Sequence, residues 1–249
     1  MSATILVLGG TAEARALAAA LHETPGVRVI STLAGRISHP RLPAGELRVG
    51  GFGGPPGLAA YIREEHVDAL IDATHPFAER MSWSALEACS HTSTPLLRIE
   101  RPAFPRDPAI DWREVGSLEE AAALLPQAGR RVFLTTGRRG LDVFARVGGA
   151  FFLVRCVEAP DRGEALPPDH QLLLDRGPFE LQDELALIDR HTLDVLITKD
   201  SGGDMTRAKL DAARARDMPV IVVARPPRPA SMTVATVEQA LAWLHSHAG

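Results

Sequence analysis

The chain has 249 residues, of which 45% are hydrophobic and 23% are charged, as is usual for a globular protein with one large or two small domains. Its formal net charge of −4 argues against nucleic acid as the main partner. It contains no run of about 18 apolar residues, so we expect no membrane span.

The N-terminus and the cysteines indicate the compartment. The chain runs straight into a strand pattern, without the charged and apolar regions of a signal peptide. Cys89 and Cys156 are far apart in apolar stretches, so we expect reduced core residues in a cytoplasmic protein. The nine histidines show no metal-ligand spacing, and no metal site is expected. The sequence does not fix the oligomeric state, and a monomer is compatible with it.

The first predicted element is a short apolar strand, Ile5–Leu8, followed by Gly9-Gly10-Thr11 and an alanine-rich helix. This layout predicts a phosphate-binding turn at a helix N-terminus, where glycines let the backbone approach an anion. The spacing differs from G-x-G-x-x-G, so a tight turn without a ligand is the alternative. Glu13 suits the helix dipole but would repel a pyrophosphate; we expect it to brace the loop or bind a ribose hydroxyl.

Strand and helix patterns then alternate along the chain, which predicts parallel sheets covered by helices on both faces. Up to residue 99 we expect strands at 27–33, 46–49, 67–73 and 95–99, and helices at 58–66 and 78–90. Beyond it we expect strands at 111–115, 131–136, 151–157, 195–198 and 220–224, helices at 180–191 and 205–216, a short helix after Gly140, and capped helices opening at Ser117 and Thr236.

A proline-rich segment divides these elements. Residues 100–108 hold three prolines in nine positions and cannot continue a helix or a central strand. We therefore predict an α/β protein with two Rossmann-like parallel-sheet domains: residues 1–101 as the nucleotide-binding domain, 102–110 as the linker, and 111–249 as the second domain. We expect the active site in the cleft between the two domains.

Ligands of such sheets bind beyond the carboxyl ends of the strands. The second strand ends with Ser31 and Thr32, and Arg36 follows where an NAD enzyme usually has an acid, which favours the 2′-phosphate of NADP over a plain polar loop. The cofactor residues that we predict are Gly9, Gly10, Thr11, Glu13, Ser31, Thr32, Arg36, Gly51, Phe52, Gly53 and Thr74.

Two further loops carry groups that can do chemistry. His75 follows the fourth strand and is a candidate acid, a hydrogen-bond donor or a structural cap. Lys199, one of only two lysines, stands beside Asp200 and a Ser201-Gly202-Gly203 backbone nest that can bind an anion. A solvated turn is the alternative for this second loop.

Taken together, these loops resemble the precorrin-6A reductase family of cobalamin biosynthesis. The matching segments are Leu8-Gly9-Gly10-Thr11-Ala12-Glu13, Asp72-Ala73-Thr74-His75-Pro76-Phe77-Ala78, Arg98-Ile99-Glu100-Arg101-Pro102, Thr136-Gly137-Arg138-Arg139-Gly140 and Thr198-Lys199-Asp200-Ser201-Gly202. The resemblance implies NADPH-dependent reduction of one double bond of the precorrin-6A macrocycle, giving precorrin-6B. An anaerobic relative acts on the cobalt-containing ring, and these motifs do not separate the two.

The implied substrate is a tetrapyrrole with many carboxylates, which arginines and anion nests would bind. On this basis the expected substrate residues are Thr136, Gly137, Arg138, Arg139, Lys199, Asp200, Ser201, Gly202 and Gly203. His75, Lys199 and solvent are the candidate proton sources. A non-catalytic NADP-binding regulatory protein is an alternative. An epimerase or dehydrogenase of small substrates is disfavoured, because Tyr61 is the only tyrosine and no Tyr-x-x-x-Lys pair exists.

Overall fold

The computed structural model describes residues 3–35 and 41–247. The chain forms two compact units, the first made of Met1–Pro102 with Pro226–Gly249 and the second of Ala103–Arg225. The chain therefore crosses between the units twice. None of the helices in the part of the chain described is long and apolar enough to cross a bilayer.

The first unit contains a sheet of six strands in the order β12-β5-β4-β1-β2-β3, with every pair parallel. Chain order reverses between β1 and β4, which makes the carboxyl ends of these two strands the switch point where such sheets bind ligands. The strands are β1 (Ala3–Leu8), β2 (Val27–Leu33), β3 (Glu46–Val49), β4 (Ala69–Asp72), β5 (Leu96–Ile99) and β12 (Met232–Val234).

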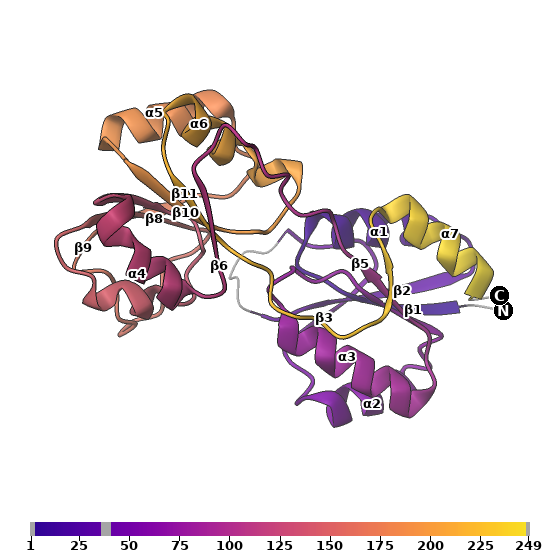
Figure 1. Ribbon diagram of the computed structural model, residues 1–249. Coiled ribbons are helices and arrows are strands. Elements are labelled where there is room, and N and C mark those ends of the chain that lie inside the picture. Colours follow the sequence, from indigo (N-terminus) through magenta and orange to yellow (C-terminus); the bar gives the residue numbers. More distant parts are fainter. Residues whose placement is uncertain (1–2, 36–40, 248–249) are drawn as a thin grey trace. The chain divides into compact units, whose positions relative to one another are not determined.

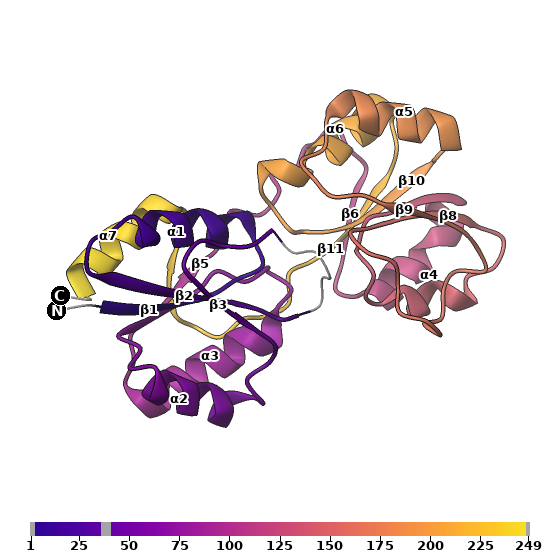
Figure 2. The ribbon, with the colours of Figure 1, turned by 180° about the vertical axis from the view of Figure 1, so that it is seen from behind.

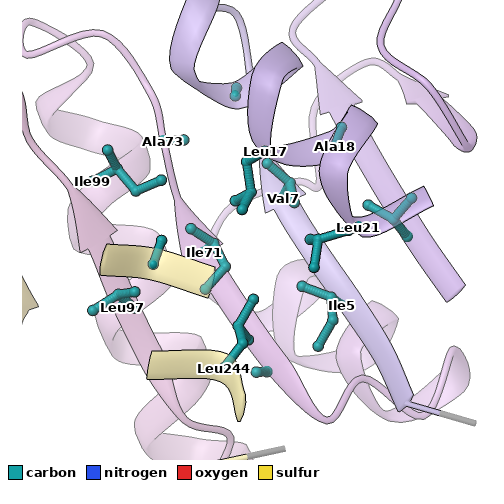
Figure 3. Close-up of a cluster of buried hydrophobic side chains, with 14 residues drawn as sticks. Ile5, Val7, Leu17, Ala18, Leu21, Ile71, Ala73, Leu97, Ile99 and Leu244 are labelled. Atoms are coloured by element: carbon teal, nitrogen blue, oxygen red, sulfur yellow. The ribbon is translucent and has the colours of Figure 1, made fainter. Parts of the chain in front are cut away.

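Helices cover both faces of this sheet (Figure 1). Helices α1 (Ala12–His22) and α7 (Val237–His247) lie on one face, and α2 (Pro55–Glu64) and α3 (Glu79–Thr92) lie on the other. Successive strand residues point to opposite faces, so Ile5 and Val7 pack under α1 and α7 in the cluster shown in Figure 3. Leu6 and Leu8 pack under α2 and α3 in the same way.

The second unit repeats this architecture with the parallel order β6-β11-β10-β7-β8-β9. Its switch point lies between β7 and β10. Helices α5 and α6 cover one face, and α4 covers the other (Figure 2). The elements are β6 (Trp112–Val115), α4 (Leu118–Ala128), β7 (Arg131–Leu134), the 3-10 helix η1 (Leu141–Arg146), β8 (Phe151–Cys156), β9 (Asp169–Leu174), α5 (Leu181–His191), β10 (Val195–Lys199), the 3-10 helix η2 (Asp204–Thr206), α6 (Ala208–Ala215) and β11 (Val220–Val223).

The predicted α/β class with two Rossmann-like sheets is confirmed, and the predicted strands and helices are present with small differences at their ends. The predicted cap at Ser117 is also present, because its Oγ accepts the Glu120 N–H at 3.1 Å. Cys89 and Cys156 are buried and free, one in each unit. Two strands, β9 and β12, were not predicted.

The predicted assignment of the C-terminal residues to the second domain was wrong. Strand β12 pairs with β5, and α7 buries Ala240 and Leu244 in the core of the first unit. The predicted linker, 102–110, is not a free connection either, because Phe104 is buried in the core of the second unit. Local periodicity identifies a strand or a helix but carries no information about which sheet it joins.

We expect Leu244→Ala to destabilise the first unit by about 2–5 kcal/mol, the usual cost of emptying a buried leucine site. The native cysteines provide the readout. Burial raises the pKa of the Cys89 thiol to about 12, so a thiol reagent labels it when the unit opens. Labelling of Cys89, followed by mass spectrometry, should accelerate while labelling of Cys156 stays unchanged. Leu125→Ala in α4 of the second unit should accelerate labelling of Cys156 and leave labelling of Cys89 unchanged. If Leu244→Ala accelerated labelling at Cys156 alone, the placement of α7 in the first unit would be wrong.

Candidate functional site

Thr11 connects the turn after β1 to the end of β4. Its Oγ1 caps α1 by accepting the Ala14 N–H at 3.1 Å, and the same hydroxyl donates to the Ala73 carbonyl at 2.7 Å. The predicted cofactor residue Thr11 therefore uses its side chain to hold two loops together at the switch point of the first unit. The helix that it caps is 11 residues long, long enough for its dipole to favour an anion at this end.

The two glycines of this turn have different roles. Gly9 donates its N–H to the Thr32 carbonyl at 3.0 Å, and a Cβ on Gly9 would lie 2.9 Å from that oxygen. Close packing against β2 therefore requires Gly9. Gly10 has a φ of +114° and nothing within 4 Å of where a Cβ would stand. This space beside the first N–H groups of α1 fits the phosphates of a dinucleotide.

Glu13 is paired with Arg101, which follows β5. The Arg101 Nη1 atom lies 3.1 and 3.0 Å from the two carboxylate oxygens. Burial acts to raise the pKa of the Glu13 carboxyl, but its own N–H, together with the charge and the hydrogen bonds of Arg101, lowers it overall. Glu13 thus braces the loop as an ionised group, which is one of the two roles expected for it.

The predicted residues at the end of β2 are less accessible than their polarity suggests. Ser31 is 2% exposed and Thr32 is 6% exposed, and the Ser31 Oγ has no hydrogen-bond partner within 3–35 and 41–247. Arg36 lies outside the described residues. After β3 comes the loop of Gly51, Phe52 and Gly53, in which both glycines are exposed. The Phe52 ring packs against Tyr61 with the ring centroids 5.3 Å apart.

Arg48 of β3 holds this last loop in place. Its guanidinium lies 4.7 Å from the ring centroids of both Phe52 and Tyr61, and its Nη2 donates to the Gly51 carbonyl at 3.1 Å. The Phe52 ring is therefore packed between Arg48 and Tyr61. A ligand of this loop would contact its backbone.

Asp72, at the end of β4, is the centre of a buried polar cluster and is 0% exposed. It accepts hydrogen bonds from the Thr74 Oγ1 and Ser82 Oγ atoms, each at 2.6 Å. Arg98 of β5 forms a buried ion pair with it, with Nε 3.4 Å from Oδ2. The hydroxyl of the predicted cofactor residue Thr74 is thus directed into the protein, where it fixes the loop after β4.

Arg228, on the return of the chain to the first unit, holds the same loop. Its Nη2 donates to the Thr74 Oγ1 at 3.1 Å and to the His75 carbonyl at 3.2 Å, and its Nη1 lies 3.7 Å from Glu100. The His75 Nδ1 accepts the Phe77 N–H at 3.2 Å, so the proton of a neutral ring sits on Nε2. This bond fixes the turn before α3 but does not cap the helix, because the N-cap Ala78 has no side-chain hydrogen bond. The capping role expected for His75 is therefore wrong.

In the second unit, Lys199 bridges the switch point. Its Nζ donates to the Thr136 carbonyl at 2.9 Å, which joins the ends of β10 and β7. Burial lowers the pKa of the Lys199 ammonium, and the Arg139 charge lowers it further. The Thr136 Oγ1 is buried and has no hydrogen-bond partner in the part of the chain described. Gly137, with a φ of +80°, leaves open space where a Cβ would stand.

The two arginines of this loop differ. Arg138 forms an ion pair with Asp161, with Nη1 3.2 Å from Oδ1. Arg139 is exposed; no hydrogen bond or ion pair connects it to residues 3–35 or 41–247. The structure thus brings Thr136, Arg139 and Lys199 together as groups that can bind a carboxylate.

Asp200 and the following residues shape the next loop. The Asp200 Oδ1 accepts the Phe104 N–H at 2.9 Å; its carbonyl accepts from the Arg225 Nε at 3.0 Å, and its Oδ2 lies 3.6 Å from the same nitrogen. Asp200 therefore holds the segments by which the chain enters and leaves the second unit. The predicted nest follows, with Ser201 buried and positive φ angles at Gly202 and Gly203.

Several residues with structural roles at these loops were missed by sequence reasoning. Arg98 and Arg101 stood inside a matching segment but received no role. Arg228 is 154 positions from Thr74, and nothing local marked it. No group of three or more His, Cys, Asp or Glu side chains that could hold a metal ion occurs among the residues that the structure describes.

Two Rossmann-like parallel sheets, the first with a glycine turn before a helix at its switch point, are an architecture typical of nucleotide-binding α/β proteins. Comparison with known proteins specifies it further. The family model described as precorrin-6x reductase CbiJ/CobK matches residues 4–245. The chain belongs to this family of oxidoreductases of cobalamin biosynthesis, which implies a nicotinamide cofactor. The resemblance read from the motifs is thereby confirmed.

The relatives agree over nearly the whole chain. A precorrin-6A reductase of Rhodococcus erythropolis is 51% identical over 241 residues, which cover 96% of each chain. The solved structure of "CobK precorrin-6A reductase" matches with a TM-score of 0.92 and 39% identity, covering 98% of this chain and 97% of that one. A cobalt-precorrin-6A reductase of Priestia megaterium is 31% identical, covering 89% of this chain and 90% of its own.

We expect Gly10→Val to abolish binding of the nicotinamide nucleotide while the protein remains folded, because the side chain would fill the open space at the N-terminus of α1. Fluorescence titration with NADPH and a thermal melt measure the two properties. Gly163 in the second unit also has a positive φ, +92°, and open space, so Gly163→Val controls for backbone strain. Native NADPH affinity in a folded Gly10→Val protein would rule out this turn as the phosphate site.

Proposed function

We propose that the protein uses NADPH to reduce one double bond of precorrin-6A, giving precorrin-6B. Membership of the reductase family supports the reaction, and the Gly10 turn at the β1/β4 switch point is the observation in this chain that carries it. NADPH bound at this turn would supply a hydride to one ring carbon, and a proton from solvent or a side chain would complete the reduction. The protein's contribution is to hold and orient the two reactants.

The surroundings of β2 support NADPH over NADH. An enzyme that prefers NAD usually places an acid at the end of the second strand to bind the ribose hydroxyl. Here the first acid after β2 is Glu46. It begins β3, so it stands at the amino end of the strand beside β2 and away from the carboxyl ends where ligands bind. There it pairs with Arg28 at 2.6 Å. The connection between β2 and β3 carries Arg36 and Arg41 instead, and a guanidinium suits a phosphate.

The second unit offers binding groups for the substrate carboxylates. The Lys199 ammonium lies at the end of β10, and the Arg139 guanidinium follows in the loop after the neighbouring strand β7. The Thr136 hydroxyl can donate a hydrogen bond. Arg138 is already paired with Asp161, so its share in binding should be smaller. Lys199, His75 and solvent stay the predicted proton sources. The location of the active site between the units and the cytoplasmic location also stay predictions.

The metal-free ring is the substrate that we propose. The chain is 51% identical to a precorrin-6A reductase but only 31% identical to a cobalt-precorrin-6A reductase. The purified protein should consume one NADPH per precorrin-6A, with loss of absorbance at the NADPH band and a change in the tetrapyrrole spectrum. NADH should be used less efficiently, and cobalt-precorrin-6A should be the slower substrate. NADPH binding with no consumption would instead indicate a regulatory protein, and faster turnover of the cobalt ring would reverse the substrate assignment.

We expect kcat/KM for the tetrapyrrole to fall as the pH rises through the pKa of Lys199. This pKa lies below the ordinary lysine value of 10.5, so the fall should begin at a lower pH than for an exposed lysine. The sign follows because only the protonated amine attracts a carboxylate, and kcat/KM reports groups of the free enzyme. Lys199→Met should raise the KM for the tetrapyrrole by about 10–150-fold, the usual loss of a charge-assisted contact, and leave the KM for NADPH unchanged.

Lys199→Arg provides the matched variant, because an arginine stays charged throughout the accessible pH range. It should keep substrate affinity and remove the alkaline fall. An unchanged fall in both variants would show that another group titrates, and a raised KM for NADPH would place part of the cofactor in the second unit.

A further inference from the structure

The turn that fits the cofactor phosphates contains an acidic side chain. Glu13 stands in the first turn of α1, two residues after the cap residue Thr11. This position places a negative charge at the N-terminus of the helix, which is the end that favours an anion. The same charge opposes a phosphate brought to the same turn.

Arg101 supplies the compensating charge. Its Nη1 contacts both oxygens of Glu13, at 3.1 and 3.0 Å, and the two side chains are only 18% and 26% exposed. At this degree of burial, salt and water screen the charges less than on an open surface. The pair is therefore close to neutral as a unit. Arg101 comes from the segment after β5, so a separate part of the chain neutralises the acid of α1.

We propose that Arg101 is a positioning residue for the nucleotide: it neutralises Glu13 and so lets the turn accept the cofactor phosphates. The inference rests on the proposed function, since it presumes that a nucleotide binds at this turn. It assigns Arg101 an action through Glu13 and not a contact with the nucleotide itself. This distinction can be tested, because removing the Glu13 carboxylate should restore the NADPH affinity that is lost when Arg101 is removed.

The experiment measures NADPH dissociation constants by fluorescence for the wild type, Arg101→Gln, Glu13→Gln and the double variant. Arg101→Gln should weaken binding about tenfold, because it leaves an uncompensated negative charge beside the phosphates. Glu13→Gln should bind at least as tightly as the wild type. The double variant should return to within about threefold of the wild type, since neither charge remains.

Salt supplies a second readout. The defect of Arg101→Gln should shrink as ionic strength rises, because salt screens the repulsion, whereas a lost structural contact would not recover. Arg28→Gln is the matched control: Arg28 pairs with Glu46 and Glu65 at 2.6 and 2.8 Å, within the same unit and away from this turn. Its NADPH affinity should be unchanged. Thermal melts without nucleotide show that each variant is folded.

The outcomes separate the two proposals. A wild type that does not bind NADPH, or that binds it without reducing precorrin-6A, would overturn the proposed function. If the wild type binds NADPH and the double variant is as weak as Arg101→Gln, Arg101 acts directly on the nucleotide or on the fold, and the inference is wrong. It is equally wrong if Arg101→Gln alone keeps native affinity.

Discussion

The double crossing of the chain between its two units is the constraint on which the rest of the structure depends. Each crossing is fixed by polar contacts within a unit. In the second unit, Asp200 binds both the entering segment at Phe104 and the leaving segment at Arg225. In the first unit, Glu100 and Arg228 lie 3.7 Å apart on the corresponding segments. Because of this route, the outer strand beside β5 comes from the C-terminal residues, and the outer strand beside β11 comes from the segment that enters the second unit.

The contacts that secure the crossings also fix the loops where ligands are expected. Arg101 binds Glu13 in the phosphate turn, and Arg228 holds the loop that carries His75. Asp200 stands between Lys199 and the Ser201 nest. The matching segments of the family therefore contain two kinds of residue. Some leave space or charge for a ligand, as Gly10 does, and others keep the loops in position.

The order of strands and helices could be predicted from the sequence because it is a local property. The turn at Gly9-Gly10 was evident for the same reason. The strands β9 and β12 were missed because their apolar stretches are short: β9 begins with three polar residues, and β12 has three residues with a threonine in the middle. The partners of the site residues were missed because they are remote in sequence. Phe104 and Asp200 are separated by 96 positions, and no spacing rule connects them.

The two sheets have equivalent strand orders but carry different groups at their switch points. In the first, a threonine hydroxyl bridges β1 and β4, and α1 follows with 11 residues, so aligned peptide dipoles are available to a phosphate. In the second, an ammonium bridges β7 and β10, and the turn leads only into the 3-10 helix η1, of 6 residues. A short 3-10 helix offers little dipole, so anion binding there depends on side-chain charge, which Lys199 and Arg139 supply. Discrete cations suit the scattered carboxylates of a tetrapyrrole better than a helix N-terminus does. This difference favours the nucleotide on the first unit and the ring on the second.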